Sequence, residues 1–121
     1  MIYNITDLEV YKASINLLKD LYNFLLKVPN SEFDSVKNCK RAAKSIPANL
    51  AEGFAKRRSE ATFKNHLQIC IGSSDEVVAH IMTIAAVVPK LTNEADIIAK
   101  KYIILSKRSN TLHKNWKSYQ F

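Results

Sequence analysis

The sequence has few of the residues that make tight turns, and it lacks a long apolar run. Two of its 121 residues are glycine and three are proline, too few for the many short connections of an all-β sandwich or barrel. With His80 neutral, the longest stretch without a charge is 77–89, which is shorter than the about 20 residues of a membrane span. The scarcity of turn residues favours long helices, and the lack of a long apolar run argues against a membrane partner.

Cysteine is also scarce. Cys39 and Cys70 lie in apolar stretches without CxxC spacing, so we expect buried thiols in a reducing compartment, with a disulfide as the alternative. The N-terminal residues lack the basic segment and apolar run of a secretory signal. We therefore expect a cytoplasmic protein.

The composition is otherwise that of an ordinary globular protein, with 47% hydrophobic and 24% charged residues. A chain of this length usually builds one core, so we expect a single domain over 1–121. Eighteen Lys and Arg residues against eleven Asp and Glu residues give a net charge of +7. Such a surplus favours an acidic partner such as nucleic acid.

Apolar residues recur at spacings of three and four in four segments, which predicts helices at about 7–28, 32–53, 60–88 and 93–118. The pattern is longest in the third segment, at Phe63, Leu67, Cys70, Ser74, Val77, Ile81, Ile84 and Val88. Residues suited to cap the four helices are Thr6 or Asp7, Ser31, Ser59 and Thr92. Short connections make neighbouring helices antiparallel, so the sequence predicts an all-α, antiparallel up-down-up-down four-helix bundle.

The second segment contains Pro47 inside its helical pattern. Proline removes a backbone hydrogen bond and clashes with the preceding turn, so we expect a helix that is kinked at Pro47. Two short helices meeting near Ser45 are the alternative. Gly53 is expected to end the helix in a left-handed conformation.

The basic residues are concentrated in two parts of the chain. Residues 37–64 carry a net charge of +6 and residues 90–121 a net charge of +5, whereas 1–36 and 65–89 each carry −2. The candidate phosphate contacts are Lys37, Lys40, Arg41, Lys44, Lys56, Arg57, Arg58, Lys100, Lys107, Arg108 and Lys114. The alternative interpretation is a solvated face that keeps the protein soluble.

We find no motif typical of catalysis or of metal binding. Glu76 and His80 are spaced as a local contact on a helix surface, rather than as a di-iron motif. No glycine-rich phosphate loop, HExxH or nucleophile elbow occurs. We therefore expect no catalytic residue, no metal, no cofactor and no enzymatic activity.

Two clusters of polar and small residues have a structural and a functional interpretation. Arg41, Ser45, Asn49 and Glu52 are spaced by four, four and three, which predicts a polar stripe on one helix face; a structural hydrogen-bond network is favoured over a ligand site. Small residues at 72–74 are expected to let a neighbouring helix approach closely.

The first helical segment has two apolar tracks, one through Leu8, Ile15 and Tyr22 and another through Leu17, Leu21 and Phe24. A bundle core cannot easily cover both tracks. An uncovered apolar strip usually marks an interface, so we expect a homo-oligomer.

Three stretches carry a family likeness: residues 7–13 (DLEVYKA), 41–53 (RAA followed by SIPANLAEG after Lys44) and 72–76 (GSSDE). They resemble successive signatures of the four-helix proteins encoded in 23S rRNA intervening sequences, a family that includes the accessory variability protein of diversity-generating retroelements. The resemblance implies a homopentameric ring without enzymatic activity. For the retroelement branch it implies a basic surface that engages nucleic acid and a reverse transcriptase. Asn38, Cys39, Lys44 and His66 depart from the family pattern.

Together these observations predict a non-enzymatic, homo-oligomeric four-helix bundle protein that binds RNA or DNA through basic patches. Because phosphate contacts do not read bases, binding should be largely independent of nucleic-acid sequence. The alternative is a protein-interaction scaffold, for example an accessory subunit of a reverse transcriptase.

Overall fold

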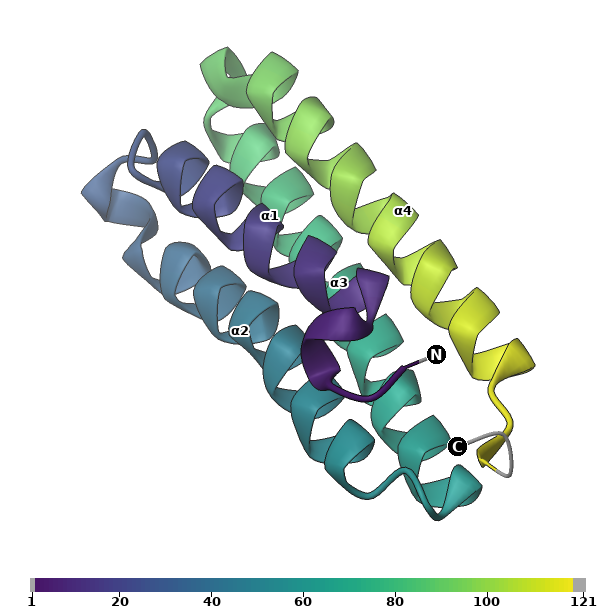
Figure 1. Cartoon of the computed structure of the whole chain (residues 1–121). Coiled ribbons are helices and arrows are strands. Elements are labelled where there is room, and N and C mark those ends of the chain that lie inside the picture. The colour runs from purple at the N-terminus through teal and green to yellow at the C-terminus, as the bar shows by residue number, and fades with distance from the viewer. Residues whose placement is uncertain (1, 119–121) are drawn as a thin grey trace.

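The computed structural model describes residues 2–118, which form four α-helices joined by short connections (Figure 1). They are α1 (Glu9–Leu25), α2 (Phe33–Ala55), α3 (Glu60–Val87) and α4 (Thr92–Asn115). Three 3₁₀ helices precede α1, α2 and α4, namely η1 (Ile5–Asp7), η2 (Asn30–Glu32) and η3 (Pro89–Leu91). The described residues contain no strand, and the predicted all-α four-helix fold is confirmed.

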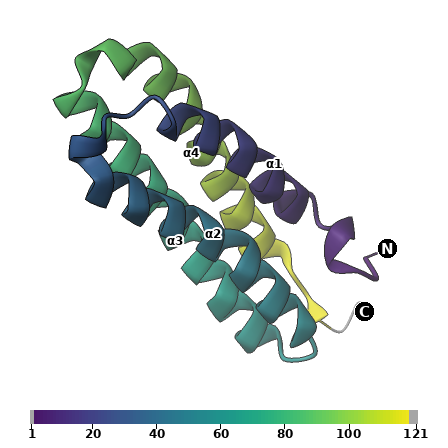
Figure 2. The same cartoon turned by 90° about the vertical axis from the view of Figure 1, so that its left-hand side faces the viewer.

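Consecutive helices lie side by side and run in opposite directions in both views (Figure 1, Figure 2). α3 packs most closely, against α2 and α4, and α1 contacts α2 and α4. The turn between α2 and α3 lies at one end of the bundle and the connection between α1 and α2 at the other (Figure 1). The length of α2 therefore separates these two regions.

The core is built around α3. All eight positions of its predicted stripe are buried, from Phe63 to Val88. Ser74 is the polar member, and its hydroxyl donates to the carbonyl of Cys70 at 2.8 Å, so burial leaves its oxygen with a partner. The spacing of three and four thus identified the inward face of this helix.

α3 is also the one helix of residues 2–118 that is long and apolar enough to cross a membrane. Its most apolar window has a mean hydropathy of 1.3. About 33% of that window is buried inside the bundle, where residues such as Leu67 and Ile81 are fully enclosed by the other helices. Packing inside the bundle therefore accounts for part of the hydropathy of α3, and the remainder of that window is not buried in the single chain.

α1 is covered better than expected. Leu8, Leu21 and Phe24 are buried, Leu17 and Tyr22 are half-buried, and the exposed member of the two predicted tracks is Ile15. The expected uncovered strip is therefore wrong for this helix, because α2 and α4 flank it on both sides and together cover a wider arc than a single neighbour can.

The helix starts differ from the predicted caps in three of four cases. Ser59 caps α3 as predicted, accepting a hydrogen bond from the Thr62 N–H at 3.2 Å. The other helices are each preceded by a 3₁₀ turn, so α1 begins at Glu9 and α2 at Phe33, beyond the expected caps, and Thr92 is the first residue of α4. Asp7 still has a local role: hydrogen bonds from the backbone N–H groups of Asn4 and Tyr3 lower its pKa.

α2 continues through Pro47 as one helix. The alternative of two short helices meeting near Ser45 is therefore wrong, and a bend at Pro47 stays a prediction. The side chain of Pro47 is buried, so tertiary packing offsets the lost backbone hydrogen bond.

The two glycines have roles opposite to those predicted. Gly53 lies inside α2 with a negative φ, so it does not end the helix in a left-handed conformation. A Cβ there would lie 2.5 Å from Cβ of His66 on α3, so a close helix approach requires glycine. Gly72 is exposed and a Cβ there would meet nothing within 4 Å, so the close approach predicted for 72–74 does not involve Gly72. It does involve Ser73, whose hydroxyl lies 2.8 Å from that of Ser45 on α2.

Candidate nucleic-acid interface

The first half of α2 carries four cations within two turns of helix: Lys37, Lys40, Arg41 and Lys44. We call them the basic ridge. Lys40 is half-buried and the other three are exposed. Among the ion pairs of residues 2–118, none involves a member of the basic ridge. Their positive charges are therefore not compensated by a neighbouring carboxylate.

An aromatic ring positions two cations of the basic ridge. Nζ of Lys40 lies 4.8 Å and Nζ of Lys44 5.8 Å from the ring centroid of Tyr22 on α1. The negative face of an aromatic ring attracts a cation without neutralising it. Tyr22 thus directs both ammonium groups toward α1 and leaves their charge available.

The buried thiol below the basic ridge adds no negative charge to it. Burial raises the pKa of Cys39 to about 12, so the thiol stays protonated at neutral pH. Burial likewise raises the pKa of Cys70 on α3 to about 12. Both cysteines are free thiols, as the sequence predicted.

The cations at the far end of α2 are mostly engaged. Nζ of Lys56 lies 3.5 Å from Oε1 of Glu52. Arg57 donates to the carbonyl of Phe54 at 3.0 Å, and its guanidinium lies 4.1 Å from the Phe54 ring centroid. Arg58 is exposed and has no ion pair within residues 2–118. Of these three predicted contacts, Arg58 is the one without such an interaction.

α4 carries a second set of exposed cations. They are Lys100, Lys107, Arg108 and Lys114. Within the described chain, none of these four residues forms an ion pair. The neighbouring Lys101 differs, because its Nζ lies 3.2 Å from Oδ2 of Asp20 on α1. α2 and α4 each pack against α1 and α3 and not closely against each other, so the structure places the two predicted patches on helices that are not neighbours.

The predicted polar stripe contributes two of its four residues to a network between α2 and α3. Ser45 and Ser73 share a hydrogen bond of 2.8 Å, and Nδ2 of Asn49 donates to the Ser45 carbonyl at 2.9 Å. Oδ1 of Asn49 lies 3.1 Å from Nδ1 of His66. Ser73 and His66 were missed by the sequence analysis, because a single-helix pattern does not identify partners on the facing helix.

The other two members of the polar stripe lie outside this network. Arg41 belongs to the basic ridge, and Glu52 pairs with Lys56. Eleven residues separate Arg41 from Glu52, about 16 Å along a helix, too far for an ion pair. The network therefore joins α2 to α3 and leaves Arg41 exposed.

Other polar groups give no sign of a metal site. Nε2 of His80 lies 3.2 Å from Oε2 of Glu76, the surface contact that the sequence predicted. Within residues 2–118 no three His, Cys, Asp or Glu side chains are grouped as metal ligands would be.

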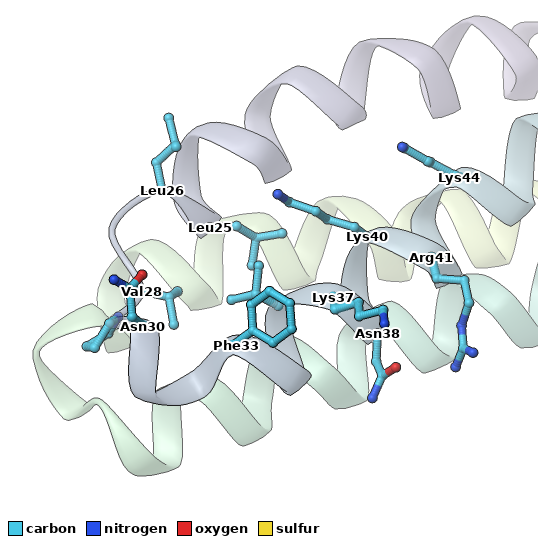
Figure 3. Close-up of a pocket in the computed structure, with 12 residues that line it drawn as sticks. Leu25, Leu26, Val28, Asn30, Phe33, Lys37, Asn38, Lys40, Arg41 and Lys44 are labelled. Carbon is cyan, nitrogen blue, oxygen red and sulfur yellow. The ribbon is translucent and has the colours of Figure 1, made fainter.

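A groove borders the basic ridge where α1 ends and α2 begins (Figure 3). Its volume is about 700 Å³. Its apolar lining includes Leu25, Leu26, Val28, Phe33 and Val36, and all four cations of the basic ridge line it as well. Phe33 is 63% exposed and Leu26 is 82% exposed. The sequence analysis did not single out either residue, because each lies outside the periodic stripes.

Comparison with known proteins identifies one family. The family model described as 23S rRNA-intervening sequence protein matches residues 6–114. No curated protein and no solved structure matches the chain. The match covers nearly all of the four helices, including the three stretches that carry the sequence likeness. The chain therefore belongs to the 23S rRNA-intervening sequence protein family.

Proposed function

We propose that this protein is a non-enzymatic nucleic-acid-binding protein whose basic ridge contacts phosphates. The observation that carries the proposal is that Lys37, Lys40, Arg41 and Lys44 have no ion-pair partner among the described residues, although other lysines of the chain are paired. Unpaired cations within two helical turns can replace the counterions of a polyanion. Arg58 and the exposed cations of α4 would provide further contacts.

The test is a binding titration by fluorescence anisotropy with labelled RNA and DNA at increasing salt. Each phosphate contact should add about 0.9 to the slope of log K against log salt for duplex DNA, and about 0.7 for a single strand. Replacing Lys37, Lys40, Arg41 and Lys44 with Gln should therefore lower the duplex slope by about 3 to 4. Affinity at low salt should fall for every sequence tested.

The matched control removes four exposed cations elsewhere, Lys12, Lys19, Lys27 and Lys90, by substitution with Gln. Both variants have the same net charge. The control should keep most of the affinity, because these residues lie outside the basic ridge. Equal losses in the two variants would mean that total charge decides binding, and no binding by the wild type at low salt would refute the function.

A protein-interaction scaffold is the second candidate, supported by large apolar side chains on the surface. On α3 and α4, Met82, Val87, Ile97 and Ile104 are each about half exposed. Apolar groups on a surface are typical of interfaces, either between copies of this chain or with a protein partner such as a reverse transcriptase. Light scattering that reports only the 13.7 kDa chain, with no protein that copurifies at high salt, would contradict this candidate.

A further inference from the structure

We propose that the groove beside the basic ridge binds an unpaired nucleotide of a single-stranded nucleic acid, with Phe33 stacking on the base and the ridge cations contacting the adjacent phosphates. The inference rests on the proposed function, because it specifies the form of nucleic acid that the basic ridge would bind. It goes further in assigning a separate role to an aromatic ring.

The ring of Phe33 is exposed to solvent. Its side chain is 63% exposed at the start of α2, whereas the aromatic residues Phe54, Phe63, Tyr102 and Trp116 are buried. In Figure 3 the ring lies next to Leu25 and Lys37 at the loop end of the groove. An exposed aromatic face beside cations is the feature with which proteins bind unpaired bases.

Positive charges lie along α2 in the same groove as that ring. From Lys37 to Lys44 the cations extend about 10 Å along α2. Figure 3 shows Lys40 and Lys44 extending toward α1, whereas the Arg41 side chain points away from α1. Cations spaced along α2 beside an aromatic ring suit a polymer with one charged phosphate for each planar base. The two carboxylates next to Phe33 in sequence, Glu32 and Asp34, do not line the groove.

The groove also has uncharged polar side chains in its lining. Asn30 and Asn38 line the groove, and an amide side chain can both donate to and accept from the edge of a base. In a duplex the base faces are stacked inside, where Phe33 could not reach them. An unpaired strand presents both the face and the edge of each base, so it matches the groove better than a duplex does.

The test compares two labelled single strands of about twelve nucleotides, one of oligothymidylate and one of abasic phosphodiester units with the same charge. Phe33→Ala should weaken oligothymidylate binding about 5- to 100-fold. It should leave both the abasic affinity and the salt slope unchanged, because no phosphate contact is lost. Phe33→Tyr, which keeps the ring, should retain the wild-type affinity.

Val87→Ala is the matched control, because Val87 is an apolar residue of α3 that is 56% exposed and lies outside the groove. It should bind both strands as the wild type does. Circular dichroism should be unchanged in all variants, since both positions are exposed.

The possible failures are distinguishable. If Phe33→Ala binds oligothymidylate as tightly as the wild type, while loss of the basic ridge abolishes binding, the groove proposal is wrong and the proposed function stands. If the wild type binds no strand and no duplex at low salt, both are wrong. If Phe33→Ala instead loses only the binding of an acidic amphipathic peptide, the groove is a peptide site and the proposal is overturned.

Discussion

The two ends of α2 carry similar numbers of cations but use them differently. At the start of the helix, the basic ridge borders a groove and has no ion pair among the described residues, although Lys40 and Lys44 lie over the Tyr22 ring. At its end, Lys56 pairs with Glu52, and Arg57 binds the carbonyl and the ring of Phe54. The net charge of a segment does not show which of its cations have such partners. The local environment of each cation therefore decides whether it can contact a phosphate.

The largest effect on stability is expected from adding a side chain at Gly53, where the end of α2 packs closely against α3. Gly53→Ala places a methyl group 2.5 Å from Cβ of His66, an atom fixed to the α3 backbone. Overpacking of this kind should lower the free energy of unfolding by about 3 kcal/mol. Urea denaturation followed by circular dichroism measures the loss.

Gly72→Ala is the control for that change, since a Cβ at Gly72 meets nothing within 4 Å. Replacing a helical glycine in open space should raise the free energy of unfolding by about 0.5 to 1 kcal/mol. If the two variants shift stability in the same direction, the close contact between Gly53 and His66 does not limit the packing of α2 on α3.

A smaller effect on stability is expected when one arginine at each end of α2 is replaced by alanine. Arg57→Ala removes the hydrogen bond to Phe54 and the stacking on its ring, so it should lower the free energy of unfolding by about 1 to 2 kcal/mol. Arg41→Ala should change it by less than about 0.5 kcal/mol, because Arg41 is exposed. Thermal unfolding of both variants gives the comparison.

Nucleic-acid binding should rank these two variants in the opposite order. Arg41→Ala should weaken binding and reduce the salt slope by about one contact, whereas Arg57→Ala should do so less. Equal effects on binding would remove the distinction between the two ends.

The smallest effect concerns the pH dependence of a contact between Glu60, at the start of α3, and Ser118. A hydrogen bond from the Ser118 N–H, 3.2 Å from Oε1, lowers the pKa of Glu60 below its usual 4.5. Because the folded-state pKa is lowered, this contact is fully present above pH 4.5 and is lost as pH falls through the lowered value. The Ser118 amide resonance should therefore shift in acid.

Two observations would check the origin of that shift. Glu60→Gln should abolish it, since the amide side chain does not titrate. Amide resonances of the basic ridge should not follow the same transition, because no ion pair of the described chain holds a carboxylate there. A common transition at both ends would point to general acid unfolding instead.

The sequence was most informative where one periodicity determined burial. The spacing of three and four along α3 identified eight buried positions, because a core helix has one consistent inward face. The scarcity of glycine and proline and the four periodic segments also predicted the all-α architecture correctly.

Features that depend on two helices could not be predicted from one. Glycine near a helix end signals either a left-handed turn or a close neighbour, and only the position of His66 shows that Gly53 serves the second purpose. For the same reason, the partners of Ser45 and Asn49 on α3 could not be predicted from the pattern of α2 alone. Phe33 was missed for a different reason: it is exposed, so it does not belong to the periodic pattern of buried apolar residues.

The chain has a single tryptophan, and its position makes it a natural optical reporter for one end of the molecule. Trp116 is buried edge-on against Phe63, with ring centroids 4.5 Å apart. About 30 Å of helix separates this aromatic cluster from Phe33. Indole emission should thus follow unfolding and stay unchanged when an oligonucleotide binds only at the groove. Quenching by an added oligonucleotide would instead indicate contact with the cations near Trp116, such as Arg58 and Lys114.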